Sequence, residues 1–197
     1  MNLRRPLLLA SNSPRRKELL ASLGLTYKAM VKEVDEAFPA HLQRQQVAEY
    51  LASHKADAYI ADLHDEVLIT ADTIVCLGDR VLNKPADHAE AKEMLLALSG
   101  TDHDVITGVC IASTERKTVF HDTTKVYFKQ LSEAEIDYYI SNYKPFDKAG
   151  AYGIQEWIGM IGIERIEGSY FNVVGLPVQK LYEKLVQLEI LAVNAQL

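Results

Sequence analysis

The sequence predicts an α/β fold, because short apolar runs alternate with amphipathic stretches along most of its 197 residues. No low-complexity linker and no repeat of fixed period interrupts this alternation. Apolar residues make up 48% of the chain and charged residues 24%, as is typical of a soluble globular protein. We expect a single domain, 1–197, which at this length can be bilobal with a smaller lobe near 75–150.

The expected helices are marked by caps and breakers. Ser13 and Pro14 suit the N-cap and the first turn of one helix, and Gly24 follows its end. Asp87 with Glu90, and Ser132 with Glu135, have the spacing of a capping box. The expected helical ranges are 15–23, 42–62, 87–98, 132–141 and 177–191.

The expected strands are apolar or β-branched runs bounded by turn residues. Their ranges are 7–10, 27–31, 67–70, 74–77, 81–82, 104–113 and 118–128. Gly78-Asp79-Arg80 and Thr114-Glu115-Arg116-Lys117 each separate two such runs and predict hairpins. A further apolar run covers 160–166.

Charge and cysteine usage exclude several classes of protein. Lys and Arg number 21 against 27 Asp and Glu, so the net charge of -6 opposes binding to a nucleic-acid backbone. Cys76 and Cys110 lie in apolar stretches without metal-ligand spacing, which favours reduced, buried thiols. No apolar run approaches the ~20 residues that cross a membrane. We therefore expect a cytoplasmic protein without nucleic-acid or membrane partners.

The segment Ser11-Asn12-Ser13-Pro14-Arg15-Arg16 is the first candidate for a binding site. Cations in the first turn of a helix oppose its dipole, at a cost of about 0.3 to 1 kcal/mol each. An external anion, most simply phosphate, bound by backbone N–H groups, hydroxyls and guanidinium groups would compensate this cost. The alternative is a solvated helix start whose cations pair with neighbouring acids.

Asp72, directly after an apolar strand, is the second candidate, because ligand-facing residues of α/β sheets collect at strand ends. With Glu33, and with Asp35 or Glu36, it could supply carboxylates to Mg²⁺, which takes one or two of them plus phosphates and waters. The alternative is that Asp72 caps a turn and that the acidic loop is solvated.

Lys55, Lys84 and Gln155 are weaker candidates taken singly. Either lysine could reach a polyphosphate, although a solvated surface amine is the commoner case. Gln155 follows two glycines and could both donate to and accept from a base edge. The signatures of P-loop, Rossmann, zinc-protease and α/β-hydrolase chemistry are absent from the sequence.

Taken together, five segments resemble the Maf family of nucleoside triphosphate pyrophosphatases. They are Leu-Ala-Ser-Asn-Ser-Pro-Arg-Arg at 9–16, Ala-Asp-Thr at 71–73, Lys-Pro at 84–85, Lys-Ala-Gly-Ala-Tyr-Gly-Ile-Gln at 148–155 and Gly-Ser-Tyr-Phe-Asn-Val-Val-Gly-Leu-Pro at 168–177. The resemblance implies a Maf/ITPase-like mixed twisted sheet with flanking helices and two lobes around a central cleft. It also implies a homodimer that uses Mg²⁺ or Mn²⁺ to hydrolyse a nucleoside triphosphate to the monophosphate and pyrophosphate.

The motifs Ala-Tyr-Gly-Ile-Gln and Gly-Ser-Tyr are similar to the branch of the family that acts on dTTP and UTP. By motif position, Asp72 matches the proton acceptor, and Arg15, Thr73 and Gln155 match positions tied to substrate choice. The positions implicated in phosphate or metal binding are Ser11, Arg16, Glu33, Lys55 and Lys84, and we add Ser13 at the helix start. Glu156 departs from the Gly that is usual there. The competing hypothesis is a non-catalytic protein that senses nucleotides or regulates cell division.

Overall fold

The computed structural model describes residues 2–192. Its strands are β1 (Asn2–Leu3), β2 (Leu7–Ala10), β3 (Lys28–Met30), β4 (Val67–Leu77), β5 (Arg80–Leu82), β6 (Asp102–Ala112), β7 (Lys117–Phe128), β8 (Ile163–Glu167) and β9 (Leu191–Ala192). Its helices are α1 (Pro14–Ser22), α2 (Gln45–Asp57), α3 (His88–Leu98), α4 (Glu133–Tyr143), α5 (Trp157–Gly162), α6 (Tyr170–Val174) and α7 (Val178–Gln187), with short 3-10 turns η1 (Ile60–Asp62) and η2 (Ala149–Ala151). Within this range no helix combines the length and the apolar character that a membrane crossing needs.

The main sheet is mixed, as the family resemblance implies. Across residues 2–192 its strand order is β3-β2-β4-β6-β7-β8, with β5 paired to β4. β2 runs parallel to both β3 and β4, whereas β4 with β5 and β7 with β8 are antiparallel. A mixed sheet accompanied by helices confirms the α/β class.

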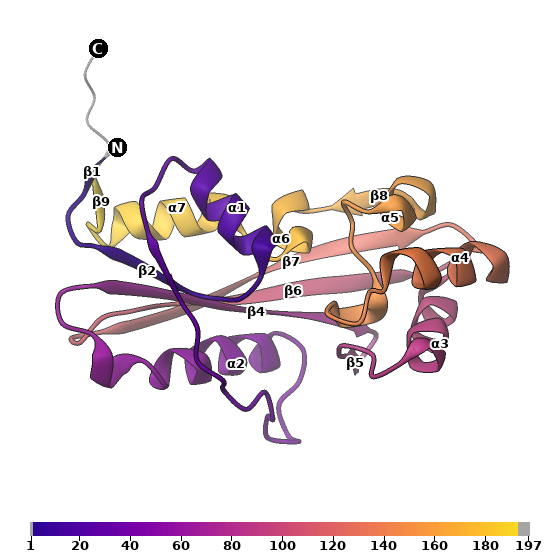
Figure 1. Cartoon of the computed structure of the whole chain (residues 1–197), viewed down its shortest axis with the longest axis horizontal. Helices are drawn as coiled ribbons and strands as arrows, with labels where there is room; N and C mark the ends of the chain where they lie inside the picture. The colour runs from indigo at the N-terminus through magenta and orange to yellow at the C-terminus, as the bar shows by residue number, and fades with distance from the viewer. Residues whose placement is uncertain (1, 193–197) are drawn as a thin grey trace, which may run out of the picture. The chain divides into compact units, whose positions relative to one another are not determined.

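The described chain divides into two compact units, which we describe one at a time. The first unit comprises 2–72, 107–122 and 175–192. In it, the side chains of β2 alternate: Leu7 and Leu9 pack in the same core as residues of α1 and α7, whereas Leu8 packs with residues of α2. Figure 1 shows α1 and α7 on one side of β2 and α2 on the other. Each buried leucine contributes about 2 kcal/mol, so this pattern fixes which face of the strand each helix covers.

The position of α2 depends on a close approach of backbones within this unit. A Cβ atom on Gly108 of β6 would lie 2.2 Å from the carbonyl oxygen of Ala48, so only glycine lets the helix pack this closely. The buried hydroxyl of Thr70 donates to the carbonyl oxygen of Ala52 at 2.6 Å. These contacts place the next turn of α2, which carries Lys55, against the same face of β4.

The second unit comprises 73–106 and 123–174. Its core is formed by buried side chains of α3, α4, η2 and the adjoining strands. Lys92 of α3 forms ion pairs with Glu133 and Asp137 of α4, at 3.0 and 2.9 Å. The capping box predicted at Ser132 and Glu135 is in place, with each side chain accepting from the backbone N–H of the other residue. At Asp87 only the N-cap forms as predicted: its side chain accepts from the N–H of Glu90, whose carboxylate accepts from the N–H of Ala86 instead. The expectation of one domain with a smaller lobe near 75–150 stays a prediction.

A histidine is buried in the core of the second unit. His103 is 2% exposed, and its Nε2 lies 2.8 Å from the hydroxyl of Tyr152. Its ring packs edge-on against Phe128 and Tyr152, with centroids 5.3 and 5.4 Å away. Burial lowers the pKa of this imidazole from the ordinary 6.5 to about 4.

We expect His103 to make the protein less stable as the pH falls from 6.5 to about 4. In this window the unfolded chain takes up a proton at the imidazole and the folded protein does not. The free energy of unfolding should therefore fall by about 2 to 3 kcal/mol between about pH 7 and about pH 4.5, beyond the loss from carboxylates. In His103→Gln this part of the loss should disappear, which urea unfolding at both pH values measures.

The matched control is His64→Gln, because His64 is exposed in the first unit. It should keep the pH dependence of the wild-type protein. Equal slopes in His103→Gln and wild type would show that the imidazole of His103 is protonated in the folded state as readily as in the unfolded chain.

Three expected elements differ from the structure. β4 continues through 71–73, where the sequence predicts the end of one strand and the start of another. The second helix ends at Asp57, with η1 beyond it. The last helix ends at Gln187, because 191–192 pair with β1. The pairing of 191–192 with β1 is a contact far away in the sequence, which no local pattern indicates.

Candidate active site

The start of α1 is built as the sequence predicts. Ser13 is the N-cap, with its hydroxyl accepting from the N–H of Arg16 at 3.4 Å, and Pro14 begins the helix. The N–H of Ser13 in turn donates to the hydroxyl of Ser11, which is buried. The first turn holds no acidic residue. Two hydroxyls and the N-terminal end of a helix therefore lie together in the segment that we expect to bind an anion.

Arg16 is held in place by the backbone of a distant segment. Its Nε donates to the carbonyl oxygen of Gly175 at 2.8 Å. Burial lowers the pKa of this guanidinium, while the carboxylate of Asp72 raises it, the charge of Arg15 lowers it and the carboxylate of Glu36 raises it. The charges of Asp72, Arg15 and Glu36 thus all act on Arg16.

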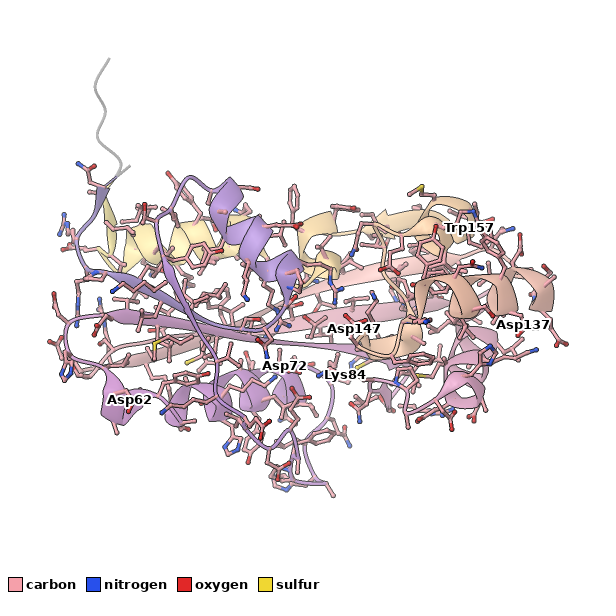
Figure 2. The ribbon with its side chains drawn as sticks, in the orientation of Figure 1. Asp62, Asp72, Lys84, Asp137, Asp147 and Trp157 are labelled. Carbon is pink, nitrogen blue, oxygen red and sulfur yellow. The ribbon has the colours of Figure 1, made fainter. Side chains whose placement is uncertain are left out.

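Asp72 lies on the face of β4 that α2 covers (Figure 2). Leu68, Thr70 and Asp72 alternate with side chains of the opposite core, so all three face α2. The carboxylate of Asp72 accepts a hydrogen bond from the ammonium group of Lys55 through Oδ1. Both side chains are mostly buried, with 11% and 16% exposed.

Lys55 also contacts a second carboxylate. Its Nζ lies 2.8 Å from Oε1 of Glu36, whose side chain is 45% exposed. Lys55 thus contacts the carboxylates of Asp72 and Glu36, and both carboxylates also act on the charge of Arg16, as does Arg15. Three cations and two carboxylates therefore interact in this region, and the surplus of positive charge favours an anion.

Of the acidic residues at 33, 35 and 36, Glu36 is the one that contacts Lys55. Glu33, the residue of this loop that the motif position predicts to bind phosphate or metal, is exposed. It forms no hydrogen bond or ion pair with another residue in 2–192. Glu36 shares Lys55 with Asp72 instead. No group of three or more His, Cys, Asp or Glu side chains suited to a metal occurs among the residues the structure describes. The role of Glu33 as a metal ligand stays a prediction.

The remaining predicted residues belong to the second unit. Thr73 is half-buried on β4, and Lys84 is exposed just after β5 (Figure 2). The carbonyl oxygen of Asn83, beside Lys84, accepts from the N–H of Gly150 at 3.2 Å, which ties this loop to the segment before Gln155. Gln155 is half-buried in the turn between η2 and α5.

Comparison with known proteins identifies the family. The sequence model of the family described as Maf-like protein matches residues 6–188, which is most of the chain. The chain belongs to the Maf family. A "dTTP/UTP pyrophosphatase" of Cytophaga hutchinsonii is 52% identical over 179 residues, covering 91% of this chain and 82% of the relative. Proteins of the same name from Christiangramia forsetii and Phocaeicola vulgatus are 49% and 52% identical, covering 91% and 92% of this chain and 92% and 95% of their own.

A solved structure supports the fold of this Maf chain. The Staphylococcus aureus Ham1 protein superimposes with a TM-score of 0.51 at 14% sequence identity, covering 94% of this chain and all of that one. At this identity the likeness concerns the fold alone, and it confirms the Maf/ITPase-like class that the family resemblance implies.

Two features of the Maf site could not be assigned from local sequence. The carbonyl oxygen of Gly175 lies in a segment that the resemblance includes, but only the fold shows that Arg16 binds it. Motif position names Glu33 in the acidic loop, whereas nothing in the local sequence marks Glu36 as the residue that contacts Lys55. The distinction depends on the position of Lys55 on α2.

Proposed function

We propose that this Maf chain hydrolyses dTTP and UTP to the monophosphate and pyrophosphate. The observation that carries this proposal is the cluster around Asp72: a mostly buried carboxylate bonded to Lys55 and close to Arg16 at the start of α1. Cleavage between the α and β phosphates needs a group that orients water and cations that stabilise the leaving pyrophosphate. Relatives about half identical to the chain carry the name of this activity.

In the proposed mechanism, the carboxylate of Asp72 orients a water molecule and accepts its proton. The water oxygen forms a bond to the α phosphorus while the bond from that phosphorus to the bridging oxygen breaks, and pyrophosphate leaves. Arg15, Arg16, Lys55 and Lys84 neutralise the phosphates, and the hydroxyls of Ser11 and Ser13 donate hydrogen bonds to them. In this mechanism the ammonium group of Lys55, which contacts Asp72 in the structure, also contacts a phosphate group when the substrate is bound.

In the second unit, Thr73 and Gln155 are proposed to select the base. A primary amide can accept from the imide N–H of uracil or thymine and donate to an adjacent carbonyl oxygen. A base without that pattern leaves the amide without a hydrogen-bond partner, which lowers the affinity of the protein for that nucleotide.

We also propose that a divalent cation, Mg²⁺ or Mn²⁺, assists the reaction. Mg²⁺ takes one or two carboxylates and fills its other positions with phosphate oxygens and water. Asp72 and Glu36, whose carboxylates share one ammonium group, fit this requirement, and Glu33 lies in the same loop as Glu36. When bound, the cation supplies positive charge to the phosphate oxygens.

A nucleotide panel tests the activity. We expect pyrophosphate release from dTTP and UTP to exceed that from dCTP, ATP and GTP about tenfold or more, and to stop with EDTA. The products are separated by ion-exchange chromatography, and Mg²⁺ and Mn²⁺ are compared at equal concentration. Release of orthophosphate would contradict cleavage at the α phosphorus. Tight binding without turnover would support the sensor hypothesis instead.

Two further properties of this chain are proposals. We propose a homodimer, as the resemblance implies, which light scattering after size-exclusion chromatography can measure. We also propose a cytoplasmic location, in keeping with the buried thiols of Cys76 and Cys110, which form no disulfide.

A further inference from the structure

A network of polar side chains in the second unit surrounds Glu156, the residue directly after Gln155. Oε1 of Glu156 lies 3.1 Å from Nζ of Lys148, and Oε2 accepts a hydrogen bond from the hydroxyl of Tyr139. Lys148 and Tyr139 are both buried. Both carboxylate oxygens are therefore bonded to the protein, so Glu156 is not placed to read a base itself.

The same network fixes the turn that carries Gln155. The hydroxyl of Tyr139 accepts from the N–H of Gly153 at 3.1 Å while it donates to Glu156. The N–H of Glu156 donates to the carbonyl oxygen of Gly153 at 3.0 Å, which closes the turn 153–156. One phenol on α4 thus holds both ends of this turn.

A close contact with α5 fixes the middle of the turn. A Cβ atom on Gly159 would lie 2.0 Å from the carbonyl oxygen of Ile154, so a larger residue there would displace the backbone. Glu156 is also the N-cap residue of α5, in an extended conformation. The backbone on both sides of Gln155 is therefore held by packing and by hydrogen bonds.

The protonation and ion pairing of these side chains keep the network intact. Burial raises the pKa of the Tyr139 hydroxyl, and its hydrogen bond to Glu156 raises it further, so the phenol stays protonated and keeps donating. Lys148 is balanced by Glu156 and by Asp147, at 2.7 Å. In contrast, the side chain of Gln155 forms no hydrogen bond with any residue in the described range 2–192, so its amide is available to a ligand.

We infer that Glu156, with Tyr139 and Lys148, is a positioning residue: it holds the turn that carries Gln155 in the place from which the amide discriminates pyrimidine bases. This inference rests on the proposed function, because it assigns base recognition to Gln155. Fixing the backbone of the turn before binding avoids the cost of ordering it, and a small displacement of a recognition group costs much of its selectivity. A Gly at 156 would leave Tyr139 and Lys148 without this carboxylate.

The test compares UTP with CTP, which lacks the imide N–H and the 4-carbonyl oxygen of uracil. Glu156→Ala and Tyr139→Phe should each lower the ratio of kcat/KM for UTP over CTP about tenfold, mainly through a higher KM for UTP. Glu156→Gln, which can still accept from Tyr139, should retain more selectivity than Glu156→Ala. The control is Glu164→Ala, an exposed carboxylate of β8 in the same unit, which should leave the ratio unchanged.

Two outcomes would overturn the inference. One is an equal loss of kcat/KM for UTP and CTP, because a merely structural role would affect both bases alike. The other is unchanged amide hydrogen exchange at Gly153 and Glu156 in Tyr139→Phe, because the turn would then not depend on the phenol.

A binding measurement separates this inference from the proposed function. Titration calorimetry with α,β-methylene analogues of UTP and CTP reports base selectivity without turnover. If the wild-type protein discriminates the analogues and the variants do not, the positioning role stands even when no hydrolysis is found. A wild-type protein that binds both analogues equally would overturn the inference while leaving pyrophosphatase activity intact.

Discussion

Replacing Asp72 with asparagine is expected to lower kcat for dTTP about 10²- to 10⁴-fold, the range over which a general base contributes. The amide keeps the shape of the side chain and one oxygen that can accept from Lys55. It has no basicity toward water and no charge for a divalent cation. Steady-state kinetics by pyrophosphate release, with the melting temperature of each preparation, measures both the loss and the integrity of the fold.

The matched control for Asp72→Asn is Asp57→Asn. Asp57 also lies in the first unit, and its Oδ1 is 2.6 Å from Nζ of Lys117, so the control likewise removes an Asp–Lys ion pair. That pair is more exposed, and it should be dispensable for turnover. A kcat in Asp72→Asn within a few-fold of the wild type would remove Asp72 from the catalytic role.

The expected melting temperatures follow from the surroundings of the pair. In Asp72→Asn, Lys55 keeps the carboxylate of Glu36 as a partner, so its charge is not left isolated. We therefore expect a smaller loss of stability than for a buried charge without a partner. Folding and turnover can then be separated in one variant.

The start of α1 was predictable because its signals are local. Ser13 and Pro14 determine the N-cap and the first turn through contacts within a few residues, and the structure has both where the sequence places them. The capping box of Ser132 and Glu135 is confirmed for the same reason. In these cases local chemistry and tertiary structure agree.

The surroundings of Asp72 were less predictable because they depend on distant partners. The sequence places Asp72 at the end of a strand, because the most strand-like run covers 67–70 and Asp72 follows it. β4 instead continues to Leu77, because its later part pairs with β5. The contact with Lys55 depends on α2 packing closely at Gly108, and no local pattern encodes that approach.

The candidate site shows the same division. Motif positions name Asp72, Arg16 and Lys55, and the structure brings these three together. The carbonyl oxygen of Gly175, 159 residues from Arg16, follows only from the fold. Residue types therefore predict the chemistry of the site, whereas the supporting contacts depend on tertiary packing.

Replacing Arg15 with alanine is expected to raise KM for dTTP about 10- to 100-fold while changing the melting temperature little. A hydrogen bond from a guanidinium group to phosphate is worth about 1.5 to 3 kcal/mol, which corresponds to this range. Arg15 is half-buried at the start of α1, and its charge lowers the pKa of Arg16, so its removal also relieves a repulsion in the protein without ligand. Stability and binding should therefore respond differently.

Arg16→Ala and Arg4→Ala give the comparison that decides the role of Arg15. Arg16 also holds the carbonyl oxygen of Gly175, so its removal should lower both the melting temperature and the affinity for triphosphate. Arg4 is an exposed arginine of the first unit, paired with Glu189 at 2.9 Å, and its removal should change neither. If Arg15→Ala instead loses stability in proportion to affinity, the cations at the start of α1 serve the fold. A loss of affinity alone would mean that the helix start tolerates their repulsion because a triphosphate relieves it on binding.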